Sequence, residues 1–386
     1  MKKKILMLIL SIFLCSCSYF QVKEAMKEAD RGNYVISLSD LLSILQKDSE
    51  DRRALDAFEL IYPSAEKHYY DEIDISKIND IIRYTKGLLN LLRVQEIYYK
   101  LPEISKNSIA VIEPPIQERN IIKKDLAQNF YTLGKGMRTV TYEEKLRTYG
   151  YFSQAKKYDL ENRKDINSEF IKSRDAAQGR FLFNFTGKNN LAKFLEEEMR
   201  VDINNYPLFS IGNNKNYNLK LDVNISNYHY LPPKTTSQSG IDSYIEKVVK
   251  RVFEKVVETK VVNGNTILVE KWVPVDKVVE VEIFYRYVRN IKRTAMEYDL
   301  AYNLYEKNGN PISQKVEKIV YEDSVVWTEY YPVHPFIGGR PFNFPMSEYE
   351  KYVMNKEELK GKVLELGNIE LNRVLSNLDS NRKIDW

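Results

Sequence analysis

Three histidines, His68, His229 and His334, are the first residues to test for catalysis or metal binding. None has another histidine, a cysteine or a carboxylate at the helical or strand spacing that metal sites use. The chain also lacks the Gly-x-Ser-x-Gly elbow, the His-Glu-x-x-His helix and the phosphate-binding Gly-x-x-x-x-Gly-Lys loop. The sequence therefore predicts no metal site, no cofactor and no catalytic residue, which favours a protein that is not an enzyme.

Two further groups of residues could do chemistry, and each has a simpler interpretation. Glu196-Glu197-Glu198 offers carboxylates for acid–base catalysis, but three consecutive glutamates are most simply a solvated helix face. Gly338-Gly339-Arg340 could form a small anion-binding turn. An irregular connection punctuated by glycine and proline explains the same residues, and we favour it.

A positively charged start and a short apolar run open the chain. Lys2, Lys3 and Lys4 precede a run from Ile5 to Leu14 that only Ser11 interrupts. This is the layout of a secretory signal peptide. A helix that spans a bilayer needs about 20 apolar residues, roughly twice the length of this run. The sequence therefore predicts an exported protein.

The end of the apolar run carries a lipidation motif. Leu14, Ser16 and Cys17 resemble the lipobox of bacterial lipoproteins, in which a small residue precedes the modified cysteine. The resemblance implies cleavage after Ser16, a diacylglycerol group on the Cys17 thiol and an acylated new amine. Several acyl chains together give a stable membrane anchor. Ser18 after the cysteine implies the outer membrane, with the periplasmic or surface face left open.

The exported part is close to electrical neutrality. Lys and Arg total 58 and Asp and Glu total 54, and loss of the three leader lysines reduces the formal charge of +4 to +1. A nucleic-acid partner needs a concentrated basic face, so none is expected. Cys15 and Cys17 are the only cysteines. We therefore expect no disulfide and no thiol chemistry in a chain long enough for two or three domains.

Residues 17–180 are predicted to be helical. Apolar and small residues recur three and four apart on both sides of Gly32-Asn33, which indicates two helices joined by a tight turn. The pattern resembles a tetratricopeptide repeat, with a poorer second match around residues 127–152. The matching positions of the first repeat are Gly32, Tyr34, Ser37, Leu38, Leu41, Ile44, Leu45 and Asp48. The resemblance implies a repeat-like α-solenoid that offers a concave surface to a protein partner, and a generic helical bundle remains the alternative.

Residues 181–346 are predicted to form an α+β domain with an antiparallel sheet. Phe181, Phe183 and Phe185 alternate as in a strand with one buried face, and a helix at residues 191–199 follows. Asn263-Gly264 and Asn308-Gly309 are strong hairpin signals, which indicates a β-meander over residues 245–331. Residues 232–243 begin with two prolines and are expected to be a loop.

Residues 347–386 are predicted to be helical. Ser347 with Glu350 and Asn355 with Glu358 are possible capping boxes. An apolar stripe follows, and such a stripe usually docks on the core of its own domain. Its members are Leu364, Leu371, Leu375 and Leu378.

The sequence therefore favours a non-enzymatic binding or assembly module, lipid-anchored through Cys17 in the cell envelope. Two other functions stay open. A surface adhesin or solute-binding lipoprotein would use the 28 tyrosines as contacts and would release peptides when intact cells are treated with protease. An enzyme acting on cell-wall glycans would need a cleft with two carboxylates about 5–9 Å apart. The partner, oligomeric state and any ligand stay open.

Overall fold

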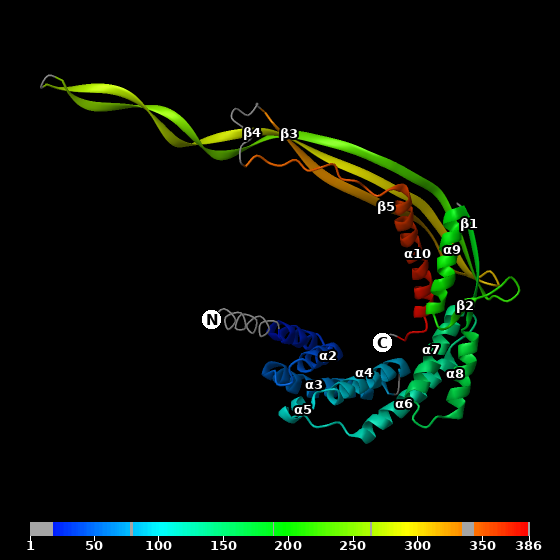
Figure 1. The fold of residues 1–386 in the computed structure, drawn as a ribbon. Coiled ribbons are helices and arrows are strands. Elements are labelled where there is room, and N and C mark those ends of the chain that lie inside the picture. Colours follow the sequence, from blue (N-terminus) through cyan, green and yellow to red (C-terminus); the bar gives the residue numbers. More distant parts are fainter. Residues whose placement is uncertain (1–17, 78–79, 188, 263–264, 334–342, 385–386) are drawn as a thin grey trace. The chain divides into compact units, whose positions relative to one another are not determined.

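A computed structural model describes residues 18–77, 80–187, 189–262, 265–333 and 343–384. The chain has the predicted α+β class, with helices first, then a five-stranded sheet and a C-terminal helix (Figure 1). It forms two compact units. One comprises Met1–Phe181, Asp202–Leu219 and Arg373–Trp386, and the other comprises Leu182–Val201 and Lys220–Asn372.

The first unit is built mainly from helices. Gly32, with φ +83°, turns the chain between the helix at residues 18–30 and the next one, as the sequence predicts. Asp51 and Asp80 start two long helices because each side chain accepts hydrogen bonds from two backbone N–H groups of the first turn. The helices after residue 30 are α2 (Tyr34–Leu45), α3 (Arg52–Ser76), α4 (Ile81–Tyr99), α5 (Glu103–Ser108), α6 (Ile116–Gly136), α7 (Tyr142–Tyr158) and α8 (Lys164–Ala176).

These helices enclose one continuous apolar core that extends from the helix at residues 18–30 to α8. Phe58 and Tyr62 are fully buried and stack with ring centroids 5.5 Å apart. Phe130 stacks on Tyr158 in the same core. Aromatic burial of this kind supplies much of the free energy that holds helices together.

The sheet has the strand order β2-β1-β3-β4-β5. Its strands are β1 (Gly179–Gly187), β2 (Phe209–Ile211), β3 (Leu219–Val262), β4 (Asn265–Glu306) and β5 (Pro311–Pro332), and α9 (Asn189–Asp202) and the short η1 (Ile203–Asn205) lie between the first two. β1 pairs with β2 in parallel, so the prediction of a purely antiparallel sheet is wrong. The reason is the helical crossover, which returns the chain in the same direction.

β3 and β4 are far longer than the sequence predicts. β3 continues through residues 232–243, so the predicted loop there is wrong. Proline is tolerated where a strand lies at a sheet edge, because its missing N–H costs no ladder bond there. The turn at Asn308-Gly309 is confirmed, with Gly309 at φ +90°. The turn predicted at Asn263-Gly264 lies outside the described residues.

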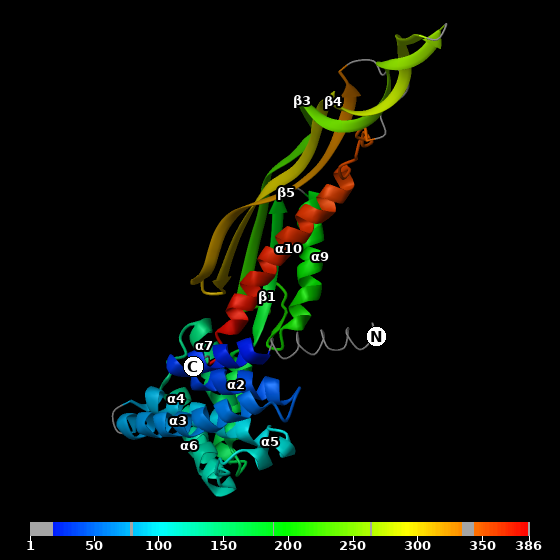
Figure 2. The same cartoon turned by 90° about the vertical axis from the view of Figure 1, so that its left-hand side faces the viewer.

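The C-terminal helix, α10 (Lys356–Ser380), lies with α9 along one face of the sheet (Figure 2). The box of Asn355 and Glu358 caps it reciprocally at 3.0 and 2.8 Å. Ser347 does not start a helix, because its hydroxyl accepts from the Tyr330 backbone N–H instead. The predicted leucine stripe is buried. Within the described residues, no helix combines the length and the apolar character needed to cross a bilayer.

Candidate protein-binding surface

The structure brings none of the sequence-predicted chemical residues into a reactive group. Cys17, His334 and the residues 338–340 lie outside the described part of the chain. His68 packs between the rings of Tyr34 and Tyr69 at centroid distances of 5.1 and 5.0 Å. Among the described residues, no cluster of His, Cys, Asp and Glu could hold a metal ion. Within the described ranges, the chemical candidates from the sequence form no such cluster.

The three glutamates on α9 form part of a charged, solvated helix face. Glu196 pairs with Arg200 at 2.7 Å, one turn further along the same helix. Glu197 pairs in the same way with Lys193 at 3.7 Å. Both arrangements are i,i+4 ion pairs of the kind that stabilise helix surfaces by a few tenths of a kcal/mol each. They give no sign of a general acid and base.

A different pair of carboxyl groups, which the sequence did not single out, meets between α3, α4 and α6. Glu66 accepts a hydrogen bond from the Tyr62 hydroxyl at 3.0 Å. Glu118 accepts from the Gln95 amide at 3.0 Å and from the Tyr70 hydroxyl. Gln95 is fully buried. Positions 23 to 52 residues apart in the chain thus meet, and no local spacing signals such a contact.

Burial controls the charge of this pair. It is the largest influence on the pKa of Glu66 and raises it; the hydrogen bond from Tyr62 opposes the rise, and the charge of Glu118 adds to it. Burial also raises the pKa of Glu118. A raised pKa is a feature of catalytic acids, but it is also a feature of structural polar clusters. Neither glutamate lines any of the cavities described below, and the cluster therefore serves to join three helices.

A candidate binding feature is an apolar groove between the helix at residues 18–30 and α3. Its cavity volume is about 430 Å³. Tyr19 and Met26 are 47% and 41% exposed along one side, and Leu60 is 63% exposed on the other. Large apolar side chains gathered in a groove mark a surface that binds another molecule. The groove is lined by Tyr19, Val22, Lys23, Met26, Arg53, Asp56, Ala57 and Leu60.

Charged side chains border this apolar floor. The Arg53 guanidinium lies 5.3 Å from the centre of the Tyr19 ring, which holds that ring against α3. Asp56 and Lys23 complete the rim. A second groove, of about 320 Å³, follows the opposite side of the same helix, where Phe20 is 63% exposed. An apolar centre with a charged rim is the composition of protein interfaces.

Two further cavities lie outside these two grooves. One, of about 200 Å³, lies between α6 and the residues that follow α7, and its lining mixes Lys124, Glu161 and Arg163. The other, of about 560 Å³, lies on the sheet beside Pro232 and Pro233. Helical periodicity alone did not reveal the groove, because Leu60 lies on an amphipathic helix and only packing shows that its side chain is uncovered.

No protein-family model, curated protein or solved structure matches this chain.

Proposed function

We propose that this protein is a lipid-anchored component of the bacterial cell envelope that binds a protein partner and catalyses no reaction. The Cys17 motif supports the anchor, and Ser18 supports the outer membrane as its location. The groove between the helix at residues 18–30 and α3 supports partner binding, and it is the observation that carries this part of the proposal. An apolar segment of the partner, such as a helix with side chains one turn apart, would fill it.

We also propose that the helix at residues 18–30 and α2 form a tetratricopeptide-like hairpin. The left-handed Gly32 between them is consistent with this, since glycine adopts positive φ without strain. Ser37, Leu38, Leu41 and Leu45 of α2 are buried, as the small and apolar positions of such a repeat require. In this arrangement Tyr19, which lines the groove, follows the lipidated cysteine by two residues in the sequence, so the partner is bound close to the membrane.

Metabolic labelling tests the anchor. Cells that express the full chain are grown with an alkyne-bearing fatty acid, and the labelled protein is followed through membrane fractionation. We expect label on the wild type and none on Cys17→Ser, which should keep its leader and leave the membrane fraction. Cys15→Ser is the matched control and should label normally. A labelled Cys17→Ser variant would disprove the anchor.

Photo-crosslinking in cells tests the groove. A benzoylphenylalanine replaces Leu60 in one strain and Ile112 in another. Ile112 is the control because it is 88% exposed and lies outside every groove described above. We expect one adduct of defined mass from position 60 only, and its loss when Asp56→Arg and Met26→Glu are added. Equal adduct patterns from positions 60 and 112 would contradict a specific partner at this groove.

A further inference from the structure

The distal part of the β3–β4 hairpin is a two-stranded arm, defined here as residues 243–262 and 265–284. β5 pairs with β4 from Tyr285 onward, where Tyr285 lies opposite Pro332, and the Val333 N–H just after β5 donates to the Phe284 carbonyl at the base of the arm. β1, the other neighbour, ends at Gly187 beside Ile225. Among the described residues, no third strand therefore pairs with the arm, and each strand presents one row of backbone donors and acceptors outward (Figure 1).

Cross-strand contacts fix the register of the arm. Lys247 pairs with Glu280 at 3.6 Å, and Arg251 pairs with Asp276 at 3.0 Å. Lys255 also pairs with Glu270. These pairs lie four residues apart on β3 and four and six residues apart on β4, and they share one face because side chains alternate with period two. The register is thus set by ion pairs within the chain.

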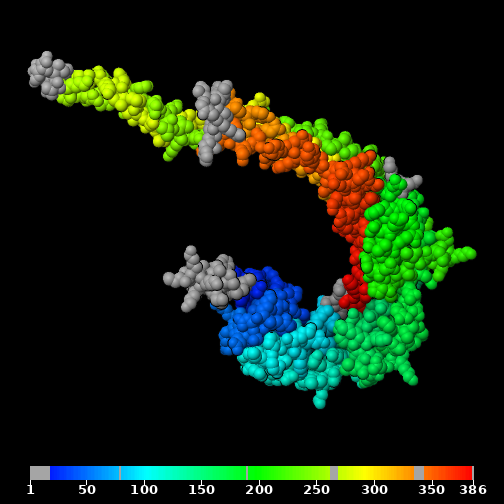
Figure 3. Space-filling model, viewed as in Figure 1, coloured from blue at the N-terminus to red at the C-terminus, as the bar shows by residue number. Residues whose placement is uncertain are grey.

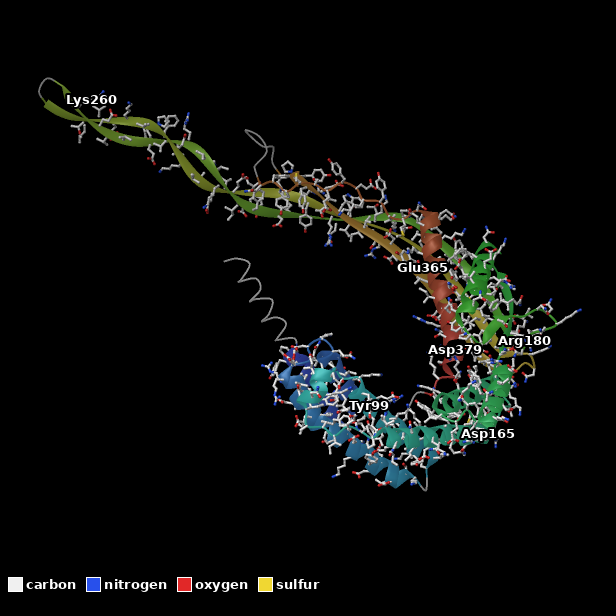
Figure 4. All side chains as sticks on the ribbon, turned by 60° about the horizontal axis from the view of Figure 1, so that its bottom comes forward. Tyr99, Asp165, Arg180, Lys260, Glu365 and Asp379 are labelled. Atoms are coloured by element: carbon white, nitrogen blue, oxygen red, sulfur yellow. The ribbon has the colours of Figure 1, made fainter. Side chains whose placement is uncertain are left out.

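Large apolar side chains lie between the ion pairs on that same face. Phe253 is 64% exposed and Trp272 is 62% exposed, and no described segment covers the face of the distal arm in view in Figure 3. Figure 4 shows side chains projecting from both faces along the strands toward Lys260. The uncovered residues of this kind are Ile245, Val249, Phe253, Val257, Leu268, Trp272, Val278 and Phe284.

Such an arm is unsuited to stand alone in water. An isolated two-stranded hairpin is marginally stable at best, because it buries little apolar surface. Open edges beside exposed apolar side chains readily accept another strand. The arm of this chain has open edges and exposed apolar side chains over 20 residues of each strand. We therefore expect its two edges to bind a partner strand.

Lipid does not fit the arm. Between Lys247 and Lys260 no more than two consecutive residues are uncharged, and between Glu270 and Glu282 no more than four. Charged side chains occur on both faces, since neighbouring positions such as Lys250 and Arg251 are both charged. Each charge placed in hydrocarbon costs several kcal/mol, so neither face can lie against acyl chains.

The two edges are complementary in charge. Residues 243–262 of β3 contain five basic and three acidic side chains, a net charge of +2. Residues 265–284 of β4 contain two basic and four acidic side chains, a net charge of −2. A β3 edge therefore attracts the β4 edge of another copy, whereas two β3 edges or two β4 edges repel each other. Arms that point the same way would continue the antiparallel alternation of strands.

We propose that copies of this chain associate head to tail, with the β3 edge of one arm paired to the β4 edge of the next. This contact joins two different surfaces, so it leaves a free edge at each end and continues into a ring or a filament. It extends the proposed assembly function but requires neither Cys17 nor the groove, so each proposal can fail alone.

Complementary charge reversals test the contact on the full chain in mild detergent, with mass measured by light scattering. Variant A, K247E/R251E/K255E, makes both edges acidic. Variant B, E270K/D276K/E280K, makes both edges basic. We expect the wild type to form oligomers and each variant alone to associate at least about tenfold more weakly. An equal mixture of A and B should restore assembly, because the edges of unlike chains then match.

The six-residue combination of A and B in one chain is the matched control. It exchanges the signs of the three ion pairs named above and leaves the pair of Lys277 and Glu254 unchanged, so it should assemble by itself and should not mix with tagged wild type. A monomeric wild type would overturn the proposal, as would assembly of A or B alone at wild-type strength. A monomeric arm that phosphatidylglycerol vesicles protect from protease would assign it to lipid and also overturn the proposal. Adducts from position 60 should persist in A and B.

Discussion

The two halves of β4 share one sequence pattern and lie in opposite surroundings. Met296, Tyr298 and Leu300 alternate with polar residues and are fully buried under α9 and α10. In the arm, Val279, Val281 and Ile283 alternate with glutamates in the same way but are only partly buried, and Trp272 and Val278 on the opposite face are more than 60% exposed. Alternation therefore determines that a segment forms a strand, while distant elements determine whether its apolar face is covered. The apolar face of the covered half packs against helices of the same chain, whereas the apolar residues of the arm are available to a second molecule.

The largest expected difference between the halves comes from removing one aromatic ring from each. Tyr298→Ala should lower the free energy of unfolding of the sheet by about 3–5 kcal/mol, because a buried ring leaves a cavity. Trp272→Ala should change it by less than about 0.5 kcal/mol, because its ring is mostly in water. Hydrogen exchange of the amides of residues 296–304 measures both in the monomer. A comparable loss from Trp272→Ala would show that the arm is covered after all.

A substitution at a helix–sheet contact should have the next largest effect. A Cβ at Gly367 of α10 would collide with the Tyr298 hydroxyl, whereas a Cβ at Gly361 of the same helix would have no atom within 4 Å. Gly367→Ala should therefore cost about 1–3 kcal/mol through overpacking. Gly361→Ala should stabilise by up to about 1 kcal/mol through helix propensity. Thermal unfolding compares the two, and a neutral Gly367→Ala would mean that α10 does not lie tightly on the sheet.

The sequence predicts turns and helix caps better than strand pairing, for a physical reason. The turn at Asn308-Gly309 and the cap at Asn355 depend on local backbone chemistry, and both are confirmed. The continuity of β3 through Pro232 depends on its place at a sheet edge, and the parallel pairing of β1 depends on residues about 30 positions away. No local pattern contains that information.

The binding groove escaped prediction for a related reason. Its walls come from two helices. Tyr19 and Leu60 are apolar residues like the buried residues near them in the same helices, and the sequence does not distinguish the exposed ones from the buried ones. Periodicity identifies the apolar face of a helix, but the area that stays uncovered depends on how the next helix packs. The charge difference between the two strands of the arm, in contrast, can be counted from the sequence. The structure adds which residues belong to each strand and how the strands pair.

The cap of α10 offers a smaller test of the covered half. Asn355→Ala removes the side chain that accepts from the Glu357 and Glu358 backbone N–H groups at 3.0 Å each. We expect a loss of about 1 kcal/mol and faster exchange in the first turn of α10. Asn377→Ala, at an exposed position of the same helix, is the control and should be neutral or slightly stabilising. An equal loss at both positions would argue against a specific cap.

The coupling energy of ion pairs should differ least between the covered half and the arm. Its pH dependence helps to distinguish the two regions. Lys315 of β5 lies 2.9 Å from Glu370 of α10, whose side chain is 7% exposed. Hydrogen bonds to Glu317 and Glu370 raise the pKa of Lys315. A lysine with a raised pKa stabilises the fold at every pH below its unfolded value near 10.4, and this contribution is lost as pH rises beyond that value.

Double-mutant cycles compare this pair with an arm pair. The coupling between Arg251 and Asp276 should be at most about 1 kcal/mol and should fall in high salt, because both side chains are more than half exposed. The coupling between Lys315 and Glu370 should exceed it and resist salt, because Glu370 is buried. It should weaken only gradually as pH rises above about 10.4, since the raised pKa keeps Lys315 charged in the folded protein beyond that value. Urea titration at pH 7 and at about pH 11.5 measures both couplings. If the two cycles gave the same coupling and the same salt response, α10 would give the sheet no more protection from water than the arm has.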